Sequence, residues 1–333
     1  MPVLVLVTGT GRSGTSTVSG TLHHLGLSVP GPYLQSNDSN PRGFFESRWS
    51  VRFHNELNLR AGVNLFDSRP HALNLVQDAI TPRDRQRLRK FLLKHAAPQV
   101  VVKDPRTAFT QRLWREEAAE VGLETKYVFM LRHPAEVVGS RTTYYAARGA
   151  DGVRAYQITN LARWVNATLI SERETRGCPR SFVPYVDLLT DWRGVMTQVG
   201  ANLGLTYNAD LDSREPHPVD DFIEPSLRRH APNWAEMAIP GDLTELAEQV
   251  WGCVVGLVGA DGVDDDASRQ LDELTEGYAE LLADSSAVCH DLITEARSTG
   301  RDDRQGPADP GLRGAARRQF GRVPRPHRRG PRH

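Results

Sequence analysis

Residues 3–16 read VLVLVTGTGRSGTS and carry the strongest structural signal in the chain. The run Val3–Val7 is apolar and mostly β-branched, which predicts a buried strand. The glycine-rich run Gly9–Ser16 follows, and Val18 and Leu22 then recur at helical spacing. A glycine-rich turn that opens a helix presents unpaired backbone N–H groups and the positive end of the helix dipole. The stretch therefore predicts strand, loop and helix in succession, with an anion-binding loop between them.

Three later apolar runs predict further strands, at Val100–Val102, Tyr127–Leu131 and Phe182–Val186. Each is separated from the preceding one by enough chain for a helical crossover. We therefore expect an α/β protein with a central parallel sheet flanked by helices, the three-layer arrangement of P-loop nucleotide-binding folds.

Helix signals occupy the segments between and after these runs. Thr81-Pro82 predicts the start of a helix that runs to about His95, and Pro134 stands where the first turn after the third strand is expected. Helical periodicity recurs in four more segments, residues 154–175, 191–203, 243–258 and 268–297. The last two of these are expected to close the C-terminal part of the domain.

Composition predicts one domain and one tail. The chain of 333 residues, with 39% hydrophobic residues, can bury one large core, so we expect a single α/β domain over residues 1–298. Within it, residues 27–72 are rich in Gly, Pro, Asn, Ser and Arg and show little periodicity, which predicts a functional loop or lid. Arg, Pro and Gly dominate residues 299–333, which predicts a disordered tail.

Two further features bear on location and cofactors. The first apolar run is too short to span a bilayer and only Met1 and Pro2 precede it, so the sequence predicts a cytoplasmic protein without a signal peptide. The three cysteines lie far apart, with neither metal-ligand spacing nor the even count of a disulfide framework. We therefore predict no metal site.

The loop departs from that of nucleotide triphosphatases at one position. Gly9 and Gly14 have the spacing of the motif G-x-x-x-x-G-K-[ST], whose lysine reaches the outer phosphates. Thr15 occupies the lysine position here, and the cation lies upstream at Arg12. This change disfavours a P-loop kinase, which is the first alternative for the function.

The run Gly11–Ser16 resembles the 5′-phosphosulfate loop of the sulfotransferase family, in which a lysine or arginine precedes Ser-Gly-Thr and a second hydroxyl residue. The resemblance implies a donor, 3′-phosphoadenosine 5′-phosphosulfate (PAPS), whose sulfonate passes to a hydroxyl and which leaves as adenosine 3′,5′-bisphosphate (PAP). It implies that the loop binds this donor, through Gly11, Arg12, Ser13, Gly14, Thr15 and Ser16.

A second motif follows the third predicted strand. Arg132 stands at the strand end and Ser140 eight residues later, which resembles the pair that grips the 3′-phosphate in sulfotransferases. A guanidinium offers phosphate a fixed fork of donors, and the helix start adds its dipole. Tyr185 resembles the aromatic residue near the adenine, although a core position explains it equally well. The two motifs occur in the order that the family requires.

Sulfonate transfer needs a base for the attacking hydroxyl and cations at the transferring group and leaving oxygen. The resemblance implies Arg12 at the leaving oxygen and Lys103 at the acceptor side of the sulfonate. The usual histidine base would stand two residues after that lysine, where this chain has Pro105. The segment 40–46 resembles the glutamate-bearing segment of bacterial relatives, so we predict Glu46 as the base. The reserve candidates are His54, His71 and Asp104, of which Asp104 could instead orient Lys103 or Arg106.

The resemblance covers about residues 3–230 and is nearer to bacterial, actinobacterial-type enzymes than to the mammalian cytosolic ones. The C-terminal runs with which the cytosolic enzymes add 3′-phosphate contacts do not occur, and Arg228 and Arg229 are weak substitutes. A second alternative function, nucleic-acid binding, rests only on the basic tail, since residues 297–333 hold eleven arginines against three aspartates. The acidic body offers no matching surface.

The acceptor itself is not readable from the sequence. We expect a small molecule, carbohydrate or glycolipid held near residues 27–72, with peripheral membrane contact through such an acceptor or the basic tail, and no specific nucleic acid. The sequence does not define the oligomeric state. Aromatic residues that could line an acceptor cleft or belong to the core are Phe44, Phe45, Trp49, Tyr144, Tyr145 and Tyr156.

Overall fold

The structure is a computed structural model that describes residues 1–37, 40, 42–145, 149–213, 215–223 and 233–295. The chain forms two compact units, Met1–Leu281 and Leu282–His333. The first unit contains the sheet and the helices described below, except the last residues of α12, which belong to the second unit. The predicted tail, residues 299–333, lies outside the described residues.

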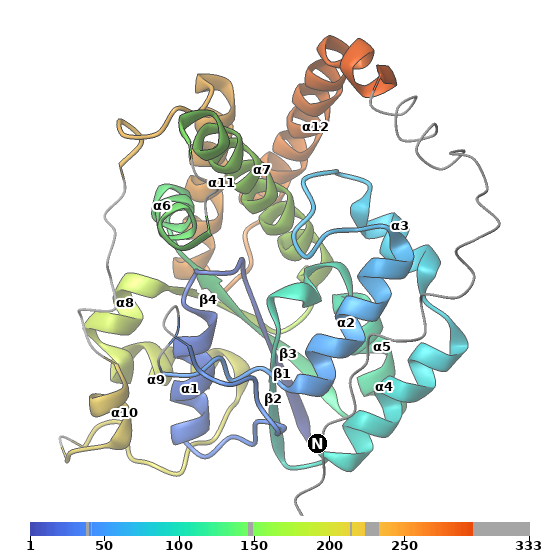
Figure 1. The fold of residues 1–333 in the computed structure, drawn as a ribbon. Coiled ribbons are helices and arrows are strands. Elements are labelled where there is room, and N and C mark those ends of the chain that lie inside the picture. The colour runs from blue at the N-terminus through green and yellow to red at the C-terminus, as the bar shows by residue number, and fades with distance from the viewer. Residues whose placement is uncertain (38–39, 41, 146–148, 214, 224–232, 296–333) are drawn as a thin grey trace, which may run out of the picture. The chain divides into compact units, whose positions relative to one another are not determined.

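The four predicted strands form one sheet, which is parallel throughout with the order β2-β1-β3-β4 (Figure 1). Their bounds are β1 Val3–Thr8, β2 Gln99–Lys103, β3 Glu124–Leu131 and β4 Arg180–Pro184. The first two strands match the prediction to within one residue at each end, whereas β3 and β4 begin earlier than predicted, at Glu124 and Arg180. The fourth also ends earlier, because Tyr185 begins a helix. The strands end together in register, with Val7 beside Lys103 and Leu131 beside Pro184. The residues that follow each strand therefore meet at one edge.

One face of the sheet is covered by four helices. Val3, Val5 and Val7 of β1 point to this face and pack with Val18 and Leu22 of the first helix. The helices here are α1 (Thr15–His24), α8 (Tyr185–Thr190), α9 (Trp192–Leu203) and α10 (Pro218–Phe222). Because side chains alternate along a strand, Leu4 and Leu6 point the opposite way and pack in a separate cluster.

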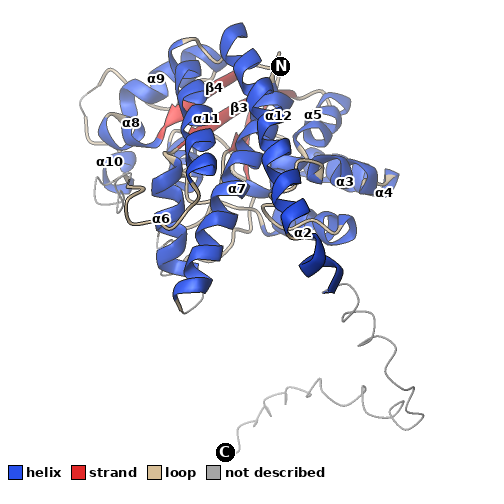
Figure 2. Ribbon diagram, turned by 90° about the horizontal axis from the view of Figure 1, so that it is seen from above, coloured by secondary structure: helices blue, strands red, loops and turns tan. Residues whose placement is uncertain are grey.

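The second face carries two groups of helices, as the red strands and blue helices of Figure 2 show. Leu4, Leu6 and Tyr127 pack against the first group, α2 (Arg48–Ala61), α4 (Pro82–Lys94) and α5 (Gln111–Glu120). Phe129 and Phe182 pack against the second group, α6 (Pro134–Tyr145), α7 (Ala150–Thr175), α11 (Gly241–Gly259) and α12 (Asp265–Val288). Helices on both faces of a parallel sheet confirm the predicted three-layer α/β fold.

Part of the 27–72 prediction is wrong, because α2 lies inside that segment. Ser47 caps the helix by accepting a hydrogen bond from the backbone N–H of Trp49. Trp49, Phe53 and Leu57 recur four residues apart and form an apolar stripe, of which Phe53 and Leu57 are fully buried. The helix also buries the polar residues Ser50, His54 and Asn58, so the apolar periodicity in the sequence is weak and tertiary packing stabilises the helix. Two more short helices lie nearby, α3 (Ala72–Ala79) and the 3₁₀ helix η1 (Pro105–Phe109).

No helix among the described residues is long and apolar enough to cross a membrane. The predicted helix starts at Pro82 and Pro134 are both confirmed.

Replacing Thr81 with Ala tests the capping of α4. The Thr81 hydroxyl accepts from the Asp84 N–H at 3.3 Å, and the Asp84 carboxylate accepts from the Thr81 N–H at 3.0 Å. We expect Thr81→Ala to lower the free energy of unfolding by about 1 kcal/mol, because the first turn loses its cap. Thr197→Ala, on the exposed face of α9, is the control and should leave the free energy of unfolding unchanged or slightly higher, because alanine favours a helix more than threonine does. Equal losses for both variants in chemical denaturation would contradict the role of the cap.

Candidate active site

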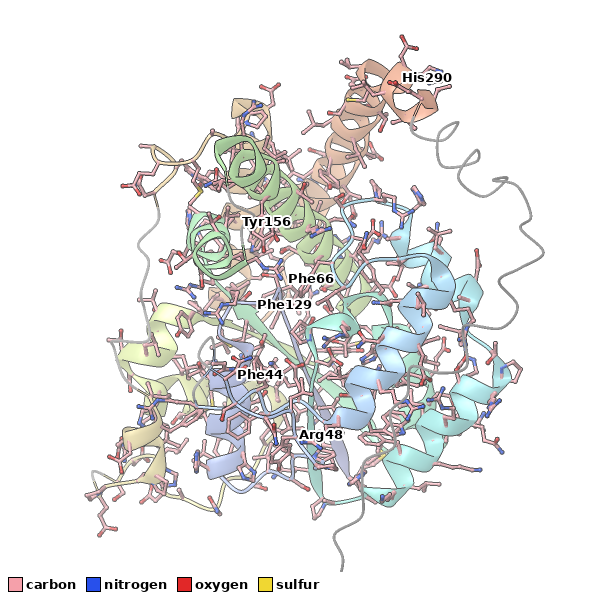
Figure 3. All side chains as sticks on the ribbon, in the orientation of Figure 1. Phe44, Arg48, Phe66, Phe129, Tyr156 and His290 are labelled. Carbon is pink, nitrogen blue, oxygen red and sulfur yellow. The ribbon has the colours of Figure 1, made fainter. Side chains whose placement is uncertain are left out.

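A cavity of about 610 Å³ opens at the carboxyl edge of the sheet. Its walls come from the glycine-rich loop, the 40–46 and 64–66 segments, the ends of β2 and β3, and helices α6 and α7. Figure 3 labels three aromatic residues that line it, Phe44, Phe66 and Tyr156. Ligands of open α/β sheets bind at this edge, where the strand ends and helix starts converge.

The glycine-rich loop is built for close approach to a ligand. Gly14 precedes the first turn of α1 with a φ of 95°, and a Cβ there would lie 2.2 Å from the Tyr185 ring. No other residue fits this position without displacing the ring. Five of the six predicted loop residues line the cavity, and Ser13 is the exception, because its buried hydroxyl donates to the Thr10 carbonyl at 2.6 Å. The first-turn N–H groups of α1 thus open toward the cavity.

Arg132 is held at the end of β3 with part of its guanidinium unused. Its Nε donates to Glu136 at 2.9 Å, and its Nη1 donates to the backbone carbonyl of Arg12 at 3.0 Å. Its guanidinium carbon lies 4.8 Å from the centre of the Tyr185 ring. The third nitrogen, Nη2, is buried and has no hydrogen-bond partner among the described residues. A buried donor left over in this way is suited to a ligand, because desolvating it without a partner costs about 1–3 kcal/mol.

Ser140, the second residue of the predicted 3′-phosphate motif, lies beside the glycine-rich loop. The Ser140 hydroxyl on α6 accepts from Arg12 Nε at 3.1 Å. Arg12, Arg132, Ser140 and Tyr185 all line the cavity, so the structure brings the two predicted donor motifs together. Tyr185 is 5% exposed, and burial raises the pKa of its hydroxyl, which is neutral at physiological pH.

Lys103 and Glu46 form a buried ion pair on the β2 side of the cavity. Lys103 Nζ lies 2.6 Å from Glu46 Oε1 and also donates to the Ser16 hydroxyl at 2.9 Å. Arg106 Nη1 contacts the other Glu46 oxygen at 3.2 Å. The two predicted catalytic residues are therefore in contact, and Ser16 links them to the loop.

The reserve base His54 is fully buried and both of its ring nitrogens are engaged. Trp114 Nε1 donates to His54 Nε2 at 2.9 Å, so the ring proton stands on Nδ1 and is donated to Asp104 at 2.8 Å. Asp104 also accepts from Arg106 Nη1 at 2.8 Å. His71 is exposed and does not line the cavity. Neither histidine is placed to take a proton from a substrate.

Asp104 orients Arg106, as the sequence allowed. Burial acts to raise the pKa of its carboxyl, but interaction with His54 and the charge and hydrogen bonds of Arg106 outweigh burial and hold that pKa well below its usual range. The ionised carboxylate in turn fixes the guanidinium that reaches Glu46.

Among the aromatic candidates, Phe44 and Tyr156 line the cavity. Trp49 instead stacks between Phe53 and Phe91, with ring centres 4.9 and 4.1 Å away, and Phe45 packs against the core. The side chains of Tyr144 and Tyr145 lie outside the described residues, as do Arg228 and Arg229.

Three polar residues that line the cavity from α6 and α7 were not among the sequence predictions. Arg141 on α6 and Asn160 and Arg163 on α7 line the cavity, together with Phe66. The only sequence signal here is the spacing of Tyr156, Asn160 and Arg163, which puts these three residues on one face of a helix. The spacing does not show what that face contacts. Within the described part of the chain, no three His, Cys, Asp or Glu side chains form a metal-binding group.

The fold is a P-loop-like α/β fold, and in its glycine-rich loop Thr15 stands where a triphosphatase has lysine. The Sulfotransferase family model matches residues 2–209, which is more than half of the chain. The chain belongs to the sulfotransferase family, as the two sequence motifs predicted.

Two solved structures are similar to this chain. The sulfotransferase domain of the Synechococcus PCC 7002 olefin synthase is 17% identical with a TM-score of 0.41, over 79% of this chain and 95% of that one. The sulfotransferase domain from the curacin biosynthetic pathway is 15% identical with a TM-score of 0.35, over 63% and 77%. No curated protein sequence gives a significant match.

Replacing Asp104 with Asn tests the buried network. The variant removes one of the two buried carboxylates that contact Arg106, and it removes the negative charge beside His54, so we expect the free energy of unfolding to fall by about 3 kcal/mol at neutral pH. The folded pKa of Asp104 lies below the unfolded value of 3.8, so its stabilisation is full above that pH and is lost as pH falls.

The difference between the wild type and Asp104→Asn should therefore shrink as pH falls below about 4. Chemical denaturation at several pH values measures it. A difference that stays constant or grows on the acid side would show that Asp104 is not the stabilising carboxylate.

Proposed function

We propose that this chain transfers a sulfonate group from PAPS to a hydroxyl of a small-molecule, carbohydrate or glycolipid acceptor. Membership of the sulfotransferase family supports the reaction class. The observation that carries the choice of donor is the unused Nη2 of Arg132, because Arg132 is one of the residues that line the same cavity as the glycine-rich loop. A donor with phosphates at both its 5′ and 3′ positions fits two such sites.

In this proposal the loop holds the 5′-phosphosulfate. Backbone N–H groups at the start of α1, the Thr15 and Ser16 side chains and Arg12 face the anion. Arg132 and Ser140 hold the 3′-phosphate, and the Tyr185 ring supports the guanidinium. A guanidinium anchored by Glu136 and by the Arg12 carbonyl is already oriented and keeps Nη2 available to donate to the phosphate.

The chemical step is an in-line displacement at sulfur. The acceptor oxygen forms a bond to sulfur as the bond between sulfur and the 5′-phosphate oxygen breaks, and PAP leaves. Glu46 takes the acceptor proton, while Lys103 and Arg12 stabilise charge on the sulfonate and leaving oxygens. Lys103 already contacts both Glu46 and Ser16, so a small movement of its amine toward the sulfonate frees one carboxylate oxygen.

The network behind Glu46 positions it. Arg106 contacts Glu46 and is itself held by Asp104, which is 0% exposed. None of these steps uses a metal ion, and we propose that the reaction proceeds without one. The cytoplasmic location and the contacts of the basic tail stay predictions from the sequence.

Calorimetric titration with PAP, adenosine 5′-phosphate and ATP tests the donor class. Without magnesium, PAP should bind more tightly than the other two. Arg132→Ala should weaken PAP binding by about 10- to 100-fold, because a charged hydrogen bond contributes about 1.5–3 kcal/mol, and should leave adenosine 5′-phosphate almost unchanged. Arg83→Ala, an exposed arginine on α4, is the control.

Magnesium-dependent preference for ATP would instead favour the P-loop kinase. Equal losses for PAP and adenosine 5′-phosphate would mean that Arg132 does not read the 3′-phosphate.

Glu46→Gln tests the base. With radiolabelled PAPS and a panel of phenols, sugars and glycolipids, we expect label transfer to fall by about 100-fold or more while PAP affinity stays the same. Glu120→Gln, exposed at the end of α5, should retain wild-type transfer. Transfer by Glu46→Gln at the wild-type kcat would show that Glu46 is not the base.

A further inference from the structure

Helices α6 and α7 give the cavity a polar wall whose residues lie outside the two predicted donor motifs. Its members, Arg141, Tyr156, Asn160 and Arg163, are called the α6–α7 wall below. Arg141 Nη1 donates to Asn160 Oδ1 at 2.6 Å, and the Arg141 guanidinium carbon lies 4.5 Å from the centre of the Phe66 ring. Two of the four members are therefore fixed in place, and Figure 3 labels Tyr156 and Phe66 on this side of the cavity.

Arg163 differs from the other cations of the cavity. Its side chain makes no hydrogen bond, ion pair or ring contact with any residue that the structure describes, and its Nε is buried. It stands three residues after Asn160, hence beside it on α7. A partly buried guanidinium without a counter-charge is costly, and an anionic ligand removes that cost.

Within the wall, Arg141 lies beside Gly11 of the glycine-rich loop, whereas the α7 residues lie toward the β2 side of the cavity. Ile170 of α7 packs with Phe109 of η1, the short helix that follows Lys103. Asn166 of α7 donates to the backbone carbonyls of Asp67 and Arg69 at 2.7 and 3.0 Å, which ties the helix to the segment after Phe66. Arg163 therefore stands on the stretch of α7 that packs over the β2 side, where Lys103 and Glu46 lie.

We propose that the α6–α7 wall is an oxyanion subsite for the acceptor, so that the natural acceptor carries a carboxylate or phosphate in addition to its reacting hydroxyl. This inference rests on the proposed function. Arg163 grips the oxyanion through its paired N–H groups, and Asn160 and Arg141 flank it. The hydroxyl is thereby directed at Glu46.

Two measurements on the full chain test this subsite. The first is the affinity for PAP of the wild type, Arg163→Gln and Arg173→Gln, where Arg173 is an exposed arginine on the same helix. We expect all three to agree within about twofold. The second is anomalous diffraction from crystals of each PAP complex soaked in tungstate, a tetrahedral oxyanion.

The wild type and Arg173→Gln should bind two tungstate ions, one beside Lys103 in the place of the sulfonate and one on the Arg163 guanidinium. Arg163→Gln should retain only the first. A loss of PAP affinity of about tenfold or more in Arg163→Gln would reassign Arg163 to the donor and overturn the proposal, as would a wild-type structure with no ion on Arg163. If no variant binds PAP, the proposed donor fails, and soaked crystals without PAP still show whether Arg163 takes an oxyanion.

Discussion

Buried carboxylates hold the cations of the cavity in place before any anion enters. Glu46 contacts Lys103 and Arg106, Asp104 contacts Arg106, and Glu136 contacts Arg132. These three carboxylates are 0–5% exposed, so their charges are weakly screened and their partners are strongly oriented. A site that binds a multiply charged donor needs its cations close together, and without these pairs their mutual repulsion would open the cavity. Preorganisation of this kind lowers the cost of ordering when the ligand binds.

The parallel sheet makes this arrangement reachable from distant parts of the chain. Each strand is followed directly by a residue of the site: Gly9 after β1, Asp104 after β2, Arg132 after β3 and Tyr185 after β4. Because the strands are parallel and in register, these residues meet at one edge of the sheet. The same topology explains why the donor motifs could be predicted from the sequence. Each begins directly after an apolar run, and the register of a parallel sheet then fixes its place.

What the sequence could not supply depends on tertiary contacts. Helix α2 was missed because its helical state comes from packing of Phe53 and Leu57 on the sheet. Trp49 could not be assigned to core or cleft until its stacking between Phe53 and Phe91 was seen. Ser13 points away from the cavity because its hydroxyl donates to the Thr10 carbonyl, and His54 is blocked because Trp114, 60 residues away in the sequence, donates to its ring. Neither contact can be inferred from the sequence. The α6–α7 wall was missed for the same reason, because a helical face does not reveal what it faces.

The central claim is that the glycine-rich loop and Arg132 together read the two phosphate positions of one nucleotide. A crystal structure of the PAP complex tests this claim most directly. The account predicts the 5′-phosphate over the N–H groups at the start of α1 and the 3′-phosphate within hydrogen-bond distance of Arg132 Nη2 and Ser140. A structure with the 3′-phosphate elsewhere and Arg132 Nη2 still without a partner would contradict it.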